Sequence, residues 1–143
     1  MHPARNAIYA EVGGNGWPLS LNYERHIAGN FHVRVGAGLY LADSGVYPTD
    51  QHFLVPIIPV MLQYTIGGPH HWEFGAGVMI QCVTAGCEYY SPPESCTAVK
   101  ATFLVGYRYE DEEGGLMYRA GLTPIVYESG LYYGAGMSVG WGF

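Results

Sequence analysis

The sequence predicts an all-β fold: an eight-stranded antiparallel up-and-down β-barrel of the transmembrane type, with a closed polar lumen. Three observations lead to it. Eight segments alternate apolar and polar residues with a period of two, no segment shows a helical period, and the connections alternate between short and long. Eight antiparallel strands close into a barrel that leaves no free edge. The length predicts one domain, residues 1–143.

The composition is unlike that of an ordinary soluble domain. Only 13% of the residues are charged, and glycine occurs 21 times and tyrosine 13 times in 143 residues. No apolar run reaches the length of a transmembrane helix. The net charge of −6, with six lysines and arginines, argues against a nucleic-acid partner, which requires a basic surface.

The first four strands are expected at residues 7–13, 19–24, 31–41 and 55–66. The third is the clearest, because every odd residue from Phe31 to Leu41 is apolar. Gly, Asn and Pro between residues 14 and 18 predict a turn. Pro56 and Pro59 donate no ladder hydrogen bond, so we expect them at the loop end of the fourth strand, with a bulge.

The last four strands are expected at residues 72–81, 99–109, 116–123 and 131–143. The final strand sets an aromatic and apolar face, which includes Tyr133, Met137, Trp141 and Phe143, against a face of glycine and serine. The expected strands are roughly 8 to 12 residues long, about the length that crosses a bilayer core when a strand is tilted.

The connections differ in length in a regular order. Those after the second, fourth and sixth strands are short, those after the third (residues 42–53) and fifth (residues 83–97) are long, and those after the first and seventh are intermediate. Outer-membrane barrels combine short periplasmic turns with longer external loops. The two long loops are therefore the expected sites of partner binding.

Aromatic residues of the apolar face gather beside the short turns and the last residues, which share one rim of a barrel. This pattern predicts an aromatic girdle at a membrane interface. Its expected members are Tyr23, Phe31, Tyr64, Trp72, Tyr107, Tyr109, Tyr118, Trp141 and Phe143.

Charged residues lie on the opposite face among many glycines. We expect an ion network that closes the periplasmic half of the lumen, with Glu24 opposite Arg34, and Glu73 as a candidate partner of the neighbouring Arg108 and Arg119. Such a network satisfies buried charges and fills the lumen, or else forms a proton or ion path. The expected members are Glu11, Glu24, Arg34, Glu73, Lys100, Arg108 and Arg119.

Two other architectures fit the same alternation. A soluble lipocalin-like barrel would turn the apolar face inward and bind an apolar ligand. A self-assembling extracellular structural subunit would cover the apolar belt with other copies of itself instead of lipid.

Three cysteines, Cys82, Cys87 and Cys96, leave one without a partner within the chain. We expect a Cys87–Cys96 disulfide in the long loop, with Cys82–Cys96 as the alternative. Their spacing fits no zinc site, and we expect no metal or cofactor. The histidines do not form a nucleophile and base with any serine, so we expect no enzyme. They are His2, His26, His32, His52, His70 and His71.

The chain resembles small eight-stranded outer-membrane barrels of the outer-membrane protein A/X type, including barrels of Bacteroidetes-like bacteria. The resemblance rests on Tyr133–Phe143, Asn22-Tyr23-Glu24-Arg25, Arg34–Gly38, Val55-Pro56 and Gln63-Tyr64. It implies a location in the outer membrane, contact with outer-membrane lipid, and insertion by the barrel-assembly machinery through the final strand. It also implies a non-enzymatic role in adhesion, surface interaction or anchoring, carried by the external loops.

Overall fold

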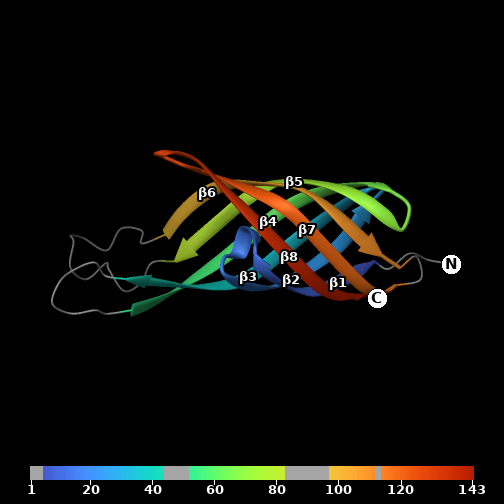
Figure 1. Cartoon of the computed structure of the whole chain (residues 1–143), viewed down its shortest axis with the longest axis horizontal. Helices are drawn as coiled ribbons and strands as arrows, with labels where there is room; N and C mark the ends of the chain where they lie inside the picture. Colours follow the sequence, from blue (N-terminus) through green and yellow to red (C-terminus); the bar gives the residue numbers. More distant parts are fainter. Residues whose placement is uncertain (1–4, 44–51, 83–96, 112–113) are drawn as a thin grey trace.

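The computed structural model describes residues 5–43, 52–82, 97–111 and 114–143. Eight strands follow one another around a closed antiparallel barrel, and β8 pairs with β1 to complete it (Figure 1). In this part of the chain no helix is long and apolar enough to span a membrane. The strands are β1 (Asn6–Gly13), β2 (Leu19–Ala28), β3 (Phe31–Asp43), β4 (His52–Gly67), β5 (His70–Cys82), β6 (Thr97–Glu110), β7 (Gly115–Tyr127) and β8 (Gly130–Gly142).

The predicted fold class is confirmed: all eight segments are strands, in the expected order. Most strands are longer than expected, and β4 reaches 16 residues. The alternation of side chains fixes the register, since a slip by one residue would exchange the two faces. Apolar residues accordingly meet apolar residues across the ladder, as Val60 does between Val35 and Val78.

The expected bulge at Pro56 and Pro59 is wrong. Strand β4 continues through both prolines with no shift of register toward β3 or β5. The β3–β4 ladder is only interrupted opposite Pro59, between the pairs Val35–Val60 and Gly38–Ile57. A Cβ atom on Gly36 would lie 2.9 Å from the Pro59 ring, so the glycine makes room for the proline. The one register shift between β2 and β3 falls instead between His26 and Ala28.

The expected end of the seventh strand is also wrong. Strand β7 passes through Pro124, which pairs with Tyr133, and continues to Tyr127. The connection to β8 is therefore a two-residue turn, Glu128–Ser129, rather than a link of intermediate length. Proline is tolerated because the β6–β7 ladder is interrupted at this level, between the pairs Thr102–Ile125 and Val105–Leu122.

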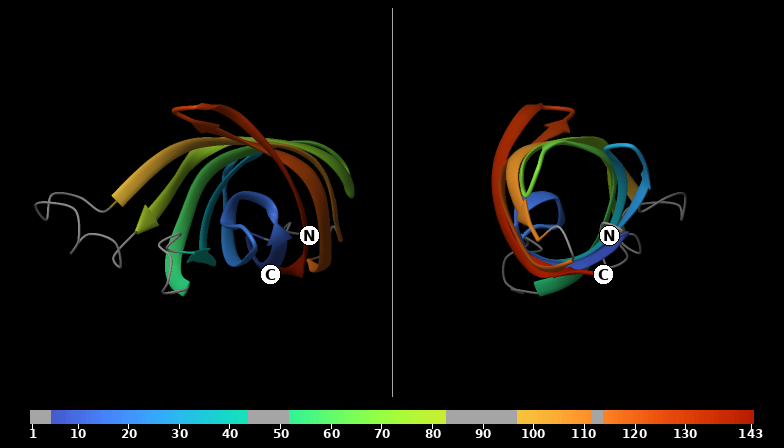
Figure 2. Two further views of the ribbon diagram at one scale, coloured as in Figure 1. Left: turned by 60° about the vertical axis from the view of Figure 1, so that its left-hand side comes forward. Right: turned by 90° about the vertical axis from the view of Figure 1, so that its right-hand side faces the viewer.

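The connection between β1 and β2 folds into the barrel. It contains the short 3-10 helix η1 (Gly14–Gly16), all three residues of which are buried. Figure 2 shows this blue segment within the ring of strands. Glycines of the surrounding wall allow the close approach: a Cβ atom on Gly136 would lie 2.7 Å from the Cα atom of Gly14, and one on Gly38 would collide with the Gly16 carbonyl. The sequence predicts the turn but not its inward direction.

Candidate functional site

The barrel is apolar outside and polar inside. Leu122 on the outer face is 61% exposed, whereas Arg34 in the lumen is completely buried. Among the described outward-facing side chains of the strands, Arg25, near the short-turn end of β2, is the one charged group. Leucine, valine, isoleucine and aromatic side chains make up much of the rest of this surface, together with alanine. This arrangement is the reverse of a water-soluble barrel that binds an apolar ligand, as in the lipocalin-like alternative.

The aromatic residues expected at one rim lie there on the outer face. Phe31 lies opposite Tyr64, and Trp72 lies opposite Tyr107, across neighbouring strands. The rings of Phe31 and Tyr64 are 4.9 Å apart. Eight of the nine side chains are exposed, and Tyr109 is half-buried. The exposed residues are Tyr23, Phe31, Tyr64, Trp72, Tyr107, Tyr118, Trp141 and Phe143.

Phe74 lies in the same aromatic band but is absent from the predicted set. It is exposed and pairs with Tyr64 across β4 and β5. Its place in the alternation of apolar and polar residues puts it on the outward face, so its position could have been predicted from the sequence. It lies one outward position farther from the turn than Trp72, and the choice of residues closest to the turn left it out.

Glu24 is the centre of a buried ion network in the half of the lumen nearest the short turns. It forms ion pairs with Arg108 and, at 3.4 Å, with Arg119. The His32 Nδ1 atom lies 3.2 Å from the Glu24 Oε1 atom. The Gln63 amide completes the contacts when its nitrogen donates to Glu24 (2.8 Å) and its oxygen accepts from Arg119 (2.7 Å).

Glu73 binds the same two arginines from the opposite wall. Arg119 holds it with two contacts, Nε to Oε2 at 2.9 Å and Nη2 to Oε1 at 2.7 Å. Arg108 lies 3.7 Å from Glu73 and donates to Glu110 at 2.6 Å. Two guanidinium groups that face each other across the β6–β7 ladder are thus paired with three carboxylates. Such pairing is what allows charges to remain buried.

Arg34 organises a second layer, farther from the short turns. It forms an ion pair with Glu11 and donates from Nε to Asn22 at 3.0 Å. Its Nη1 atom donates to Asn15 of the inward turn at 3.4 Å. Asn22 donates in turn to Ser20 at 3.0 Å. This layer therefore ties the inward turn to the wall of the barrel.

Asn15 is the residue that fastens the inward turn. Its side-chain nitrogen donates to the Thr102 hydroxyl and, at 3.2 Å, to the Phe103 carbonyl. That carbonyl lies at the level where Pro124 interrupts the β6–β7 ladder. The turn thus supplies a side-chain donor where the neighbouring proline has no N–H to offer.

Tyr9 connects the two layers. It is 1% exposed, and its hydroxyl donates to Glu24 at 3.3 Å. The guanidinium carbons of Arg119 and Arg34 lie 4.5 Å and 5.4 Å from the centre of its ring. A tyrosine ring between two buried cations adds cation–π attraction to the ion pairs. The two layers are therefore joined into one continuous set of polar contacts.

The structure corrects two of the expected ion-network assignments. Glu24 does lie opposite Arg34 in the β2–β3 ladder, but the two side chains form no ion pair: Arg34 binds Glu11, and Glu24 binds Arg108 and Arg119. Long side chains extend through the narrow lumen, so that their charged ends meet residues of strands other than the ladder neighbour. Lys100 lies apart from the network, beside Gln81 (2.6 Å) and over the Tyr127 ring.

Several residues of the lumen contacts were not among the predicted site residues, and Tyr9, Asn15, Asn22 and Gln63 are four of them. Alternation places Tyr9, Asn22 and Gln63 on the inward face, so their position could be read from the sequence. The alternation of the strands does not apply to Asn15, because this residue lies in a turn, so its inward position was not predicted. The Gly-Asn-Gly sequence next to a glycine-rich wall was the available signal.

The expected disulfide falls on residues outside the part of the chain that the structure describes. Cys87 and Cys96 lie outside the described residues, and Cys82 is described only as the last residue of β5. Within the described part of the chain, no three histidine, cysteine or acidic side chains are arranged to hold a metal ion.

Comparison with known proteins gives one informative match. No family model matches the chain, and no curated protein matches it. Among solved structures, the N-terminal β-barrel domain of Pseudomonas aeruginosa OprF superimposes with a TM-score of 0.69 at 18% identity, over 99% of this chain and 100% of that domain. The chain therefore has the fold of this eight-stranded barrel domain, and its own lumen and outer surface must indicate its role.

Proposed function

We propose that this protein is a non-enzymatic integral barrel of the bacterial outer membrane. The observation that carries the proposal is the continuous apolar outer face, which is bounded by aromatic side chains at one rim and carries Arg25 as its one described charge. A surface of this kind must be covered, and lipid covers such a belt in outer-membrane barrels. The match to the OprF barrel domain supports the same assignment.

The lumen supports a structural role rather than a pore. An eight-stranded barrel is only wide enough for side chains to fill it. Arg34, Arg108, Met61, Met117 and Gln63 are buried there, and the inward turn occupies further space. We infer that the barrel anchors its two long connections, residues 42–53 and 83–97, at the cell surface for adhesion or another surface interaction. The barrel-assembly machinery is the partner we propose for insertion.

Fractionation of the native source, combined with electron microscopy without detergent, tests the proposal. We expect the protein in the outer-membrane fraction, where it resists alkaline carbonate and is released by detergent. Ordered filaments or particles in the absence of detergent would instead mean that other copies of the chain cover the belt. Recovery as a soluble monomer would reject both assignments.

A charge in the middle of the belt should prevent stable insertion. Leu122 is exposed on β7 between Val105 and Ala135, so its side chain faces the lipid. We expect Leu122→Arg to lower the free energy of unfolding in phospholipid vesicles by about 2–4 kcal/mol, the cost of arginine at the bilayer midplane. Urea titration followed by tryptophan fluorescence measures this change.

Ile27→Arg provides the matched control for that substitution. Ile27 is also exposed, but it lies beside the β2–β3 turn, where an arginine side chain reaches the headgroups. We expect a change below about 1 kcal/mol, as for charges near the interface. Equal effects of the two substitutions would contradict a lipid-facing belt.

A further inference from the structure

The mouth of the barrel, at the end opposite the short turns, holds aromatic side chains that the lipid belt does not explain. Alternation along β3, β7 and β8 turns Tyr40, Tyr127 and Tyr132 inward. Their neighbours Leu39 and Leu131 face outward. Inward side chains deeper in the lumen are buried, but Tyr40 is 38% exposed and Tyr132 is 58% exposed. These rings therefore border an open space above the packed network.

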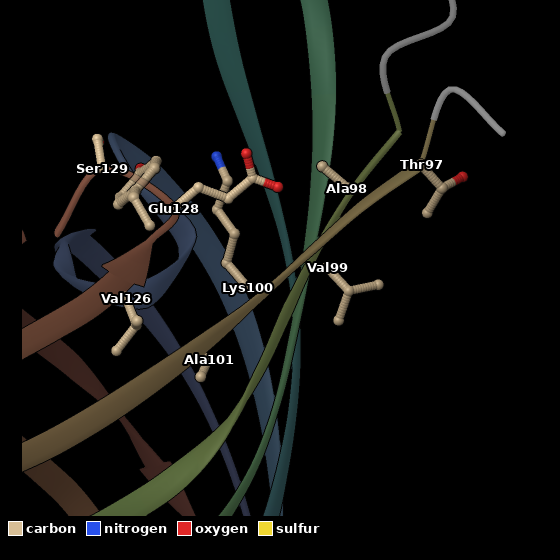
Figure 3. A pocket seen from close by; sticks show the side chains of 9 residues that line it. Thr97, Ala98, Val99, Lys100, Ala101, Val126, Glu128 and Ser129 are labelled. Atoms are coloured by element: carbon tan, nitrogen blue, oxygen red, sulfur yellow. The ribbon is translucent and has the colours of Figure 1, made fainter. Parts of the chain in front are cut away.

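That space is a cavity of about 610 Å³ above the inward turn. Its aromatic lining consists of Trp17, Tyr40, Tyr127, Tyr132 and Tyr133. Pockets that bind small molecules usually measure about 300–1000 Å³, and the mouths of β-barrels are among their common places. A second cavity, of about 890 Å³, adjoins the mouth between the ends of β6 and β7, and Lys100 lines both (Figure 3). The mouth therefore also opens to the side.

The unequal lengths of the strands explain why the mouth is hollow. The β1–β8 ladder stops at Gly136, although β8 begins at Gly130. The β2–β3 ladder stops at Leu39, although β3 continues to Asp43. The wall is thus lower over β1 and β2, whose connection folds into the lumen beneath the cavity. Trp17 follows this inward turn and is 52% exposed.

The polar groups of the lining favour a neutral ligand. The Lys100 ammonium group donates to the Gln81 oxygen at 2.6 Å and lies 4.0 Å from the Tyr127 ring centre. It therefore holds these two side chains in place, and its charge is already compensated. The Gln81 amide nitrogen and the tyrosine hydroxyls are the groups that can meet a ligand. Among the described residues that line the cavity, none is acidic.

The floor of the cavity argues against a purely apolar ligand. Ile57, Met79 and Ile125 lie there, but they pack against one another and are at most 4% exposed. The surface that a ligand meets is therefore made of aromatic rings and the hydroxyls that most of them carry.

We propose that the mouth binds the end of a neutral saccharide, about one or two sugar rings long. The faces of a sugar ring carry C–H groups that pack on aromatic rings, and its edge carries hydroxyls that donate and accept hydrogen bonds. The rings of Tyr127 and Tyr132 lie 6.3 Å apart at 74°, so they form a corner against which a sugar ring packs. The tyrosine hydroxyls and Gln81 bind the sugar hydroxyls. The site rests on the proposed function, because the mouth meets a glycan only if it faces outside the cell.

Calorimetric titration and saturation-transfer NMR of the purified full chain test this site. The detergent is of the polyoxyethylene type, which has no sugar head group. The probes are maltose, cellobiose and lactose, with glucose 6-phosphate as a charged comparison and indole as a purely aromatic one. We expect at least one neutral disaccharide to bind with a Kd of about 1 mM or lower. Binding of none of the three, or tighter binding of indole or of the phosphate, would overturn the site.

Substitution of a tyrosine of the mouth should weaken the binding. We expect Tyr132→Ala, and Tyr40→Ala from another strand, to raise the Kd at least about tenfold, as for an aromatic side chain at the centre of a binding site. Tyr118→Ala is the matched control, because Tyr118 is 49% exposed on the outer face of the other rim. It should bind as the wild type does. Wild-type affinity in both mouth variants would overturn the site. Folding is checked by the gel mobility of unheated samples.

Intact cells separate this site from the proposed function. A fluorescent conjugate of the disaccharide that binds should label cells that carry the wild type and leave cells that carry Tyr132→Ala unlabelled. If the purified chain binds the disaccharide but intact cells stay unlabelled, the mouth does not face outward and the proposed function is refuted instead. Competition by lipopolysaccharide from the same cells would identify their own surface as the source of the saccharide, and lack of competition would identify a glycan from outside.

Discussion

Glu24→Gln should destabilise the barrel by about 3–5 kcal/mol, which is the usual cost of removing one partner from a buried ion pair. Glu24 is 1% exposed and pairs with Arg108 and Arg119, so the substitution leaves two buried guanidinium groups with less negative charge. Glutamine keeps the size of the side chain, and the effect therefore reports charge rather than a cavity. Urea unfolding in phospholipid vesicles, followed by tryptophan fluorescence, measures the loss.

Two further variants identify the cause of that loss. Asp111→Asn removes an exposed carboxylate beside the β6–β7 turn and should change stability by less than about 0.5 kcal/mol. The double variant Glu24→Gln/Arg108→Met should lose less stability than the sum of the losses of its two single variants, because both substitutions remove the same ion pair. If Glu24→Gln is as stable as Asp111→Asn, the network does not hold the barrel together.

The fold was predictable because the alternation of apolar and polar residues along a strand shows which side chains face outward and which face inward. In β3, residues Phe31 to Leu39 alternate strictly, and the structure places the odd ones outside. The short turn at Gly29 and Asn30 also fixed the register of the hairpin, so Glu24 was correctly placed opposite Arg34. Local pattern and short loops determine these features, and neither requires knowledge of distant strands.

The ionic partners were not predictable in the same way. Glu24 of β2 binds Arg108 of β6, 84 residues away, and this contact depends on the closure of the barrel and the reach of both side chains. Alternation shows that a side chain points inward but not which inward side chain it meets. The Arg119–Glu73 pair was correctly placed among the candidates because Arg108 and Arg119 face each other near Glu73.

The prolines and the inward turn show a different limit of sequence reading. Proline rules predicted a bulge in β4, but Gly36 leaves space for the Pro59 ring and the strand stays in register. Likewise, the turn at Gly14–Gly16 enters the lumen because Gly38 and Gly136 leave room for it. Each outcome depends on a glycine in another strand, so a rule applied to one segment misses it.

Gly140 should be one of the positions of the wall least tolerant of a side chain. It lies opposite Tyr9 in the β1–β8 ladder that closes the barrel. A Cβ atom there would lie 2.7 Å from the Tyr9 Cα atom and would also collide with the Ile8 carbonyl and the Tyr9 Cβ. Backbone atoms cannot rotate away, so the two strands must separate and move Tyr9 from between Arg34 and Arg119.

We expect Gly140→Ala to lower the free energy of unfolding by about 3 kcal/mol, the upper part of the usual range for overpacking. Gly75→Ala is the matched control, because its Cβ would meet only side-chain atoms of Gln63, Leu104 and Met61, each at 3.2 Å. Alanine ordinarily strengthens a strand relative to glycine, so Gly75→Ala should change stability by less than about 1 kcal/mol. Urea unfolding of both variants in phospholipid vesicles measures the two changes in the free energy of unfolding. A Gly140→Ala barrel as stable as Gly75→Ala would mean that the β1–β8 ladder adjusts to a side chain, and that the position of Tyr9 between the arginines does not depend on this glycine.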